Sequence, residues 1–346
     1  MTAFVSGIRM NILQNNPYRI LGVYSNSPTK ERLANHNRMK AFLKVGKSVF
    51  FPLDLPQYLS AINRTEASVA DAESKLTLPK DQILHAQFWF IKTTPLDEVA
   101  FNHLFAGEID KTEEIWQKRE CASSLQNLLV CALMHNDYAT AISYAETLYG
   151  SAQYATQLIS AVVGDSANID IISLSHDFLD VLIEEVGCPI IIRYLNISEW
   201  KSYVSKKAVS PIIKQLEEAV AKAMSTRKNG PIARWNAGNE LMATAKQLLL
   251  QLRKLLPKSD LQYQVIADKV GIEILQCGID YFNDSEEFDA ADKAMSLQKY
   301  AKSIAVGQMA KDRCKENVDI LQRIIDNLPP SEVFVEDRAI HEELRK

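Results

Sequence analysis

The chain has 346 residues, and its 39 Lys and Arg against 43 Asp and Glu give a formal net charge of −4. This length accommodates two or three domains with a substantial core, and the acidic balance argues against a general nucleic-acid binder. The start of the chain, Met1–Leu13, lacks the apolar run of a secretory signal. No stretch approaches the roughly 20 apolar residues of a membrane span.

The glycine and cysteine content indicates the fold class and the cellular compartment. There are 12 glycines, about half the usual share, which favours long helices joined by few tight turns and predicts an all-α fold. Five widely spaced cysteines, most of them beside apolar residues, are typical of buried reduced thiols. We therefore expect a cytoplasmic protein that does not contact membranes.

Breaker residues divide the chain into five parts. We expect a leader at 1–14, a first helical region at 15–95, a second at 96–200, a helical bundle at 201–328 and a charged tail at 329–346.

The first region opens with a short helix. Asn16-Pro17 is a helix start and Gly22 a helix stop. A longer helix follows Ser27-Pro28-Thr29, with Ser or Thr as its cap. Ser48–Gln57, which contains two prolines, reads as an extended loop. Two more helices are predicted, and these span Glu66–Leu76 and Pro79–Ile91.

The helix after Thr29 carries a basic stripe. Its members recur every four residues and so drift only about 40° per step around the helix; they are Arg32, His36, Lys40 and Lys44, with Lys47 just beyond. Between Lys30 and Lys47 there are six Lys or Arg and one Glu. The stripe predicts salt-sensitive binding of an acidic surface, and the alternative is a solvated helix face.

The order of these segments resembles a J-domain, the co-chaperone module that docks on heat-shock ATPases. The resemblance rests on Pro17-Tyr18-Arg19-Ile20-Leu21-Gly22-Val23, on the basic helix, and on the Ala70 to Lys80 pattern, and it covers about a quarter of the chain. The His-Pro-Asp tripeptide of J-domains is missing after the basic helix, and Pro52-Leu53-Asp54 lacks its His. The resemblance therefore implies docking on a heat-shock ATPase chaperone without stimulation of ATP hydrolysis.

An aromatic cluster follows at the junction with the second region, formed by His85, Phe88, Trp89 and Phe90. A peptide groove is one interpretation. We favour the other, in which these side chains pack between the two regions and His85 is structural.

The second region resembles degenerate tetratricopeptide hairpins. Gly107–Lys111 and Asn136–Thr140 are matching turn-then-helix segments, 29 residues apart, and each lies between apolar helices. The usual period is 34, so no binding residue is carried over. Farther on, Cys188-Pro189 with Ile190–Ile192 is read as a helix start rather than a strand. Long amphipathic helices then predict an antiparallel bundle.

No motif for catalysis or cofactor binding is recognised, and we expect no cofactor and no metal. Cys121, Cys131 and His135 do not have the spacing of a zinc site. The sequence contains no phosphate-binding glycine loop, no nucleophile elbow and no dinucleotide fingerprint.

The sequence therefore favours a non-enzymatic adaptor that binds a protein partner, such as a heat-shock ATPase chaperone or another acidic protein. The alternative is a structural scaffold whose J-like head only caps the helical array; an unrecognised enzyme is a lesser alternative. A nucleic-acid partner would need aromatic stacking platforms beside the stripe, and we expect Phe42, Phe50 and Phe51 to be core or loop anchors instead. The sequence is also compatible with a homo-oligomer.

Overall fold

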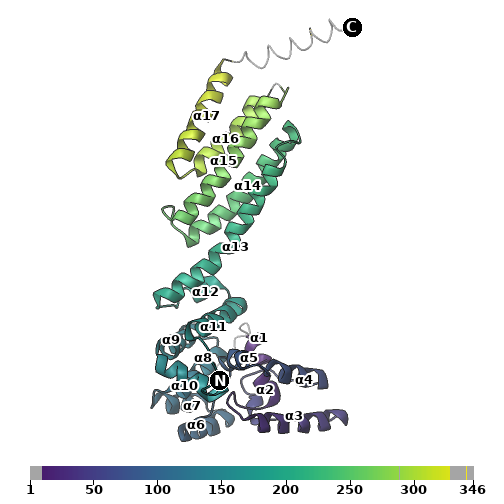
Figure 1. The fold of residues 1–346 in the computed structure, drawn as a ribbon, viewed down its shortest axis with the longest axis vertical. Coiled ribbons are helices and arrows are strands. Elements are labelled where there is room, and N and C mark those ends of the chain that lie inside the picture. The colour runs from purple at the N-terminus through teal and green to yellow at the C-terminus, as the bar shows by residue number, and fades with distance from the viewer. Residues whose placement is uncertain (1–9, 288, 328–339, 341–346) are drawn as a thin grey trace. The chain divides into compact units, whose positions relative to one another are not determined.

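The computed structural model describes residues 10–287, 289–327 and 340. Within these residues the fold is all-α, as predicted, and contains no strand (Figure 1). The chain divides into two compact units, Met1–Ser205 and Lys206–Lys346. The boundary between them falls within helix α13 (Ser198–Ser225). No helix in the described part of the chain is long and apolar enough to cross a membrane.

Most of the first helices lie close to their predicted positions. They are α1 (Asn11–Gln14), α2 (Pro17–Leu21), α3 (Thr29–Lys44), the 3-10 helix η1 (Pro52–Asp54), α4 (Glu66–Lys75) and α5 (Pro79–Ala86). Gly22 ends α2 with a left-handed φ of 67°, as the motif predicts. The predicted Ser or Thr cap of α3 is wrong, because Pro28 is the N-cap residue and no side chain caps the helix.

Helical hairpins follow in the same unit. The elements are α6 (Pro95–Phe105), α7 (Ile109–Gln117), α8 (Ala122–Met134), α9 (Tyr138–Gly150), α10 (Ala152–Val163), α11 (Ile171–Val186) and α12 (Cys188–Ile191). Helix α6 packs on α7 and α8 packs on α9. The two turns match, since Gly107 and Asn136 both have a left-handed φ, of 83° and 58°. Gly and Asn are residues that tolerate this conformation.

The segment after α5 is where the structure departs most from the prediction. Residues 87–93 are not helical, so the predicted helix Pro79–Ile91 is wrong beyond Ala86. Two side chains of α8 bind the backbone of this segment. Gln126 Nε2 is 3.0, 2.9 and 3.1 Å from the carbonyl oxygens of Ala86, Gln87 and Trp89, and Asn127 holds both backbone groups of Ile91. These side-chain amides supply hydrogen bonds that a helix would otherwise supply.

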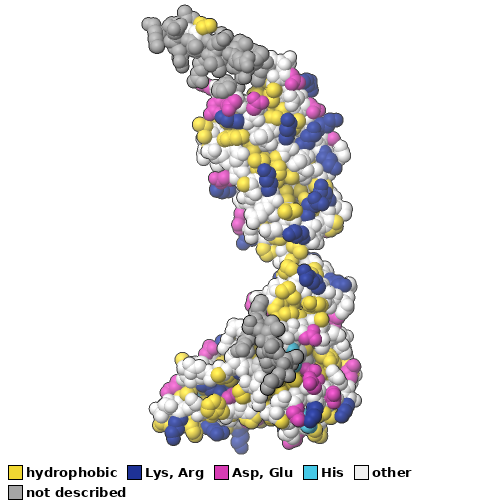
Figure 2. Space-filling view, turned by 180° about the vertical axis from the view of Figure 1, so that it is seen from behind, with side chains coloured by type: hydrophobic (Ala, Val, Ile, Leu, Met, Phe, Trp, Pro, Cys, Tyr) yellow, Lys and Arg dark blue, Asp and Glu magenta, His cyan; other side chains and the backbone are white. Residues whose placement is uncertain are grey.

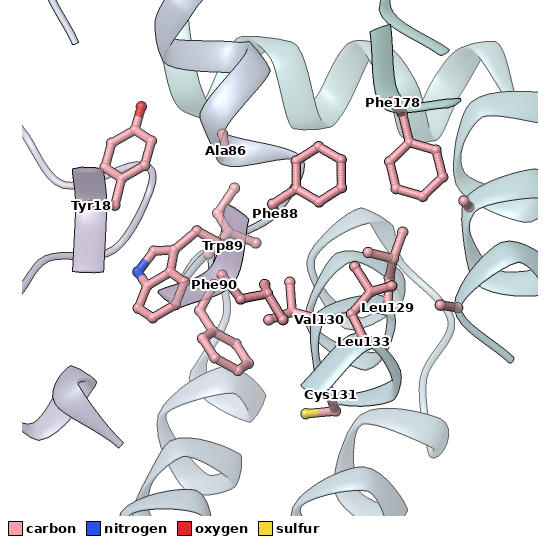
Figure 3. Close-up of a cluster of buried hydrophobic side chains, with 14 of the residues drawn as sticks. Tyr18, Ala86, Phe88, Trp89, Phe90, Leu129, Val130, Cys131, Leu133 and Phe178 are labelled. Atoms are coloured by element: carbon pink, nitrogen blue, oxygen red, sulfur yellow. The ribbon is translucent and has the colours of Figure 1, made fainter. Parts of the chain in front are cut away.

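The aromatic side chains of this segment occupy the core of the first unit. Phe88 stacks on Phe178 of α11 with ring centroids 5.3 Å apart (Figure 3). Phe90 packs edge-on against Phe101 of α6 at 5.6 Å, and Trp89 Nε1 donates a hydrogen bond to the Val23 carbonyl at 3.0 Å. One hydrophobic core therefore joins the head at residues 15–92 to the helices that follow, and it extends to Val204.

The second unit is built from long helices joined by short loops. Besides the end of α13 they are α14 (Pro231–Leu255), α15 (Leu261–Asp284), α16 (Ala290–Ile304) and α17 (Gln308–Asp326). Consecutive helices from α14 to α17 run antiparallel (Figure 1). Arg234 of α14 is 1 % exposed and pairs with Glu273 and Asp280 of α15 at 3.0 and 2.8 Å. These two ion pairs link the two helices, and both use the buried guanidinium of Arg234.

Candidate functional site

The basic stripe of α3 does not lie on one exposed face. Arg32 is 6 % exposed and His36 is half-buried, whereas Lys40, Lys44 and Lys47 are exposed. The cause is geometric, because a step of four residues turns about 40° and three steps carry the stripe from the packed side of the helix to the open side. Arg32 therefore lies outside the exposed surface, and the accessible part of the stripe is its C-terminal half.

The packed side of α3 is held by α2 and α4. Met39 is fully buried there, and Asn35 Nδ2 donates to the Leu21 carbonyl at 3.0 Å. Arg32 Nη2 lies 3.4 Å from Thr29 Oγ1 on its own helix. These contacts fix the orientation of α3, so Lys40 and Lys44 are presented by a fixed helix, and Lys47 follows in the turn just beyond its end.

The loop after α3 turns its only carboxylate inward. Asp54 accepts from Arg64 through both oxygens, with Nη2–Oδ1 at 2.5 Å and Nη1–Oδ2 at 2.9 Å. Arg64 also donates to the carbonyls of Arg19, Ile20 and Val49. Asp54 is 8 % exposed. The Pro52-Leu53-Asp54 segment is thus a structural anchor, and its carboxylate does not face solvent.

A second flank of α3 carries apolar side chains that the sequence-based interpretation did not assign to a surface. Phe42 is 39 % exposed, Val45 67 % and Phe50 78 %. The prediction that Phe50 is a core or loop anchor is therefore wrong. The guanidinium of Arg38 lies over the rings of Phe42 and Phe51, at 5.9 and 5.8 Å from their centroids. Lys and Arg side chains lie among hydrophobic ones along the lower left edge of Figure 2, where α3 and α4 lie.

The aromatic cluster at the junction is inaccessible. Phe88, Trp89 and Phe90 are each 0 % exposed, so they form no groove for a peptide. His85 is partly buried, and this burial lowers the pKa of its imidazole. Its carbonyl accepts a hydrogen bond from Asn16 Nδ2 at 2.9 Å. Nδ1 of the imidazole is buried and has no hydrogen-bond partner within the described residues, and a structural role for His85 stays a prediction.

A hollow of about 610 Å³ lies between the start of α8 and helix α10. Cys121 lines it as the N-cap residue of α8. Burial raises the pKa of this thiol, but hydrogen bonds from Ser123 and Ser124 more than offset the effect and leave the pKa below its usual value. No histidine is among the described residues that line the hollow.

Comparisons with protein-family models, with curated proteins and with solved structures find no match for this chain. The likeness to J-domains and to tetratricopeptide hairpins therefore stays a prediction.

Proposed function

We propose that the protein is a non-enzymatic adaptor and that α3 binds an acidic surface of a protein partner. The observation that carries this proposal is the position of Lys40 and Lys44, which are exposed at the C-terminal end of α3, with Lys47 exposed in the chain just beyond it. In the described part of the chain no carboxylate forms an ion pair with these three side chains. Their charges are therefore available to a partner.

By its resemblance to J-domains, the first candidate partner is a heat-shock ATPase chaperone. Docking by exposed lysines raises the rate of association more than the affinity and weakens with salt. Stimulation of ATP hydrolysis is not part of the proposal, because the loop after α3 has no His-Pro-Asp and its carboxylate, Asp54, is paired with Arg64.

A specific observation favours the structural alternative as a second candidate. The head shares one hydrophobic core with α6–α11, and Gln126 and Asn127 of α8 hold its last segment by hydrogen bonds. A head that only covers the end of a helical array would have this kind of contact. In that case the lysines of α3 form a solvated face.

The test is a titration of the whole chain with two purified probes, a heat-shock ATPase chaperone and polyglutamate, at low and at high salt. The adaptor proposal expects binding of the chaperone that salt abolishes, with the rate of ATP hydrolysis unchanged. Binding of polyglutamate alone would support an acidic partner other than the chaperone. Absence of binding to both probes at low salt would overturn the proposal and leave the structural alternative.

A further inference from the structure

We infer that the second flank of α3 is a docking surface for a protein segment in which an apolar side chain lies between carboxylates. The surface consists of Phe42, Val45 and Phe50 with Arg38 and Lys47 at its edges. It deepens the proposed function and rests on it, because it supplies the apolar contact that the lysine flank, Lys40 and Lys44, lacks.

The residues of this flank are brought together by the end of the helix. Arg38, Phe42 and Val45 follow one another at steps of four and three, so they share one side of α3. The helix then ends in a tight turn, in which Lys47 N donates to the Phe42 carbonyl at 3.0 Å and Gly46 has a left-handed φ of 69°. This turn returns the chain toward Phe42 and leads directly into Phe50.

The chain beyond the turn alternates in exposure. Val49 is 7 % exposed, whereas Phe50 is 78 % exposed, and Phe51 is half-buried beneath Arg38. This alternation is that of an extended segment with one side against the protein. Val49 and Phe51 therefore anchor the segment, and the side chain of Phe50 is directed outward.

Two side chains order the surface. The Arg38 guanidinium lies over both Phe42 and Phe51, and Arg64 lies over Phe51 at 5.1 Å from the ring centroid. Contacts of a cation with aromatic faces restrict the rotamers of both partners, so less conformational entropy remains to be lost on binding. The surface is therefore partly organised before a partner arrives.

The charges select the partner. Arg38 and Lys47 form no ion pair within the described residues, and cations at the rim of an apolar patch favour carboxylates in the partner. Single-stranded nucleic acid is less well matched, because it binds grooves in which several cations follow the phosphates and successive bases stack on aromatic rings. Here one of the three apolar residues, Val45, is aliphatic and offers no ring on which a base could stack.

The experiment uses the whole chain and short fluorescein-labelled peptides, read by fluorescence anisotropy. The probe has two leucines between pairs of glutamates. One comparison peptide replaces its leucines by serine, another replaces its glutamates by lysine, and an oligothymidylate of similar length represents nucleic acid. We expect saturable binding of the probe, and a loss of affinity of about 10-fold or more with either comparison peptide.

Variants of the protein locate the contact. Phe50→Ser and Val45→Ser change exposed side chains, and each should weaken probe binding about 10-fold. The matched control is Leu33→Ser, which changes an exposed apolar residue of α3 outside this surface, at 46 % exposure, and should leave binding unchanged. Circular dichroism verifies that each variant is folded, and Phe50→Ser alone suffices if the other does not fold.

The outcomes separate this inference from the proposed function. The inference would be overturned if all three serine variants bound the probe with the same affinity. It would also be overturned if the oligothymidylate bound more tightly than the probe. Binding that depends on Lys40 and Lys44 but not on Phe50 would also overturn it while supporting the proposed function. Loss with Phe50→Ser and Val45→Ser but not with Leu33→Ser would support it.

Discussion

Asn127 and Ile91 exchange two hydrogen bonds at the centre of the first unit. Asn127 Oδ1 accepts from Ile91 N at 2.9 Å, and Asn127 Nδ2 donates to the Ile91 carbonyl at 2.9 Å. One amide side chain of α8 thus satisfies both backbone groups of a residue 36 positions earlier. Because Asn127 is fully buried, water cannot replace it, and the head is held to the helical hairpins through this pair.

Replacement of Asn127 by alanine should destabilise the first unit. Two buried backbone groups lose their partners, which costs about 3 kcal/mol of the free energy of unfolding. Urea unfolding followed by tryptophan fluorescence measures the change, in a Trp235→Phe background so that Trp89, Trp116 and Trp200 of this unit report. Asn63→Ala, at an exposed position of the same unit, is the control. A loss no larger than that of the control would contradict the role of Asn127.

Gly22 and Gly46 should differ in their response to alanine. Both have a left-handed φ, of 67° and 69°, which costs an alanine about 1 kcal/mol. A Cβ at Gly46 meets open space, but a Cβ at Gly22 would clash with the Phe51 ring. We therefore expect the free energy of unfolding to fall by about 1 kcal/mol in Gly46→Ala and by about 3 kcal/mol or more in Gly22→Ala. Equal losses in urea unfolding would show that the ring of Phe51 moves freely.

Cys121 should react with iodoacetamide before Cys131, Cys277 and Cys314 do. Its pKa is below the usual thiol value, so the reactive thiolate appears at lower pH than in free cysteine. Burial raises the pKa of Cys131, Cys277 and Cys314, which should react only after unfolding. Peptide mass spectrometry at a series of pH values measures the rates. Ser124→Ala should move the midpoint for Cys121 to higher pH, and an unchanged midpoint would exclude its hydrogen bond as the cause.

The sequence predicts best what is decided locally. Pro17 and Gly22 bound α2 because a fixed φ and a left-handed φ are properties of single residues. Gly107 and Asn136 mark the two matching hairpin turns for the same reason. The breakers Pro231 and Asp260 likewise begin α14 and precede α15.

What the sequence does not predict depends on residues far apart in the chain. The end of α5 is set by Gln126 and Asn127, some 40 residues later. Glu185 of α11 accepts from the backbone of Asn11 and Ile12, and so caps α1 within the part expected to be a leader. In the candidate site, the four-residue spacing identifies the lysines of α3, but the burial of Arg32 and the exposure of Phe50 require the positions of α2 and α4.

The most direct test of the account reverses two charges on α3. Lys40→Glu/Lys44→Glu is compared with the unchanged chain and with Lys311→Glu/Lys315→Glu, whose lysines are exposed four residues apart on α17 and form no ion pair within the described residues. Thermal melting and binding to a purified heat-shock ATPase chaperone and to polyglutamate are measured on the same preparations. The account predicts unchanged melting in both variants and loss of binding, by about 10-fold or more, in the α3 variant alone. Binding that persists in the α3 variant, or that both variants lose equally, would contradict it.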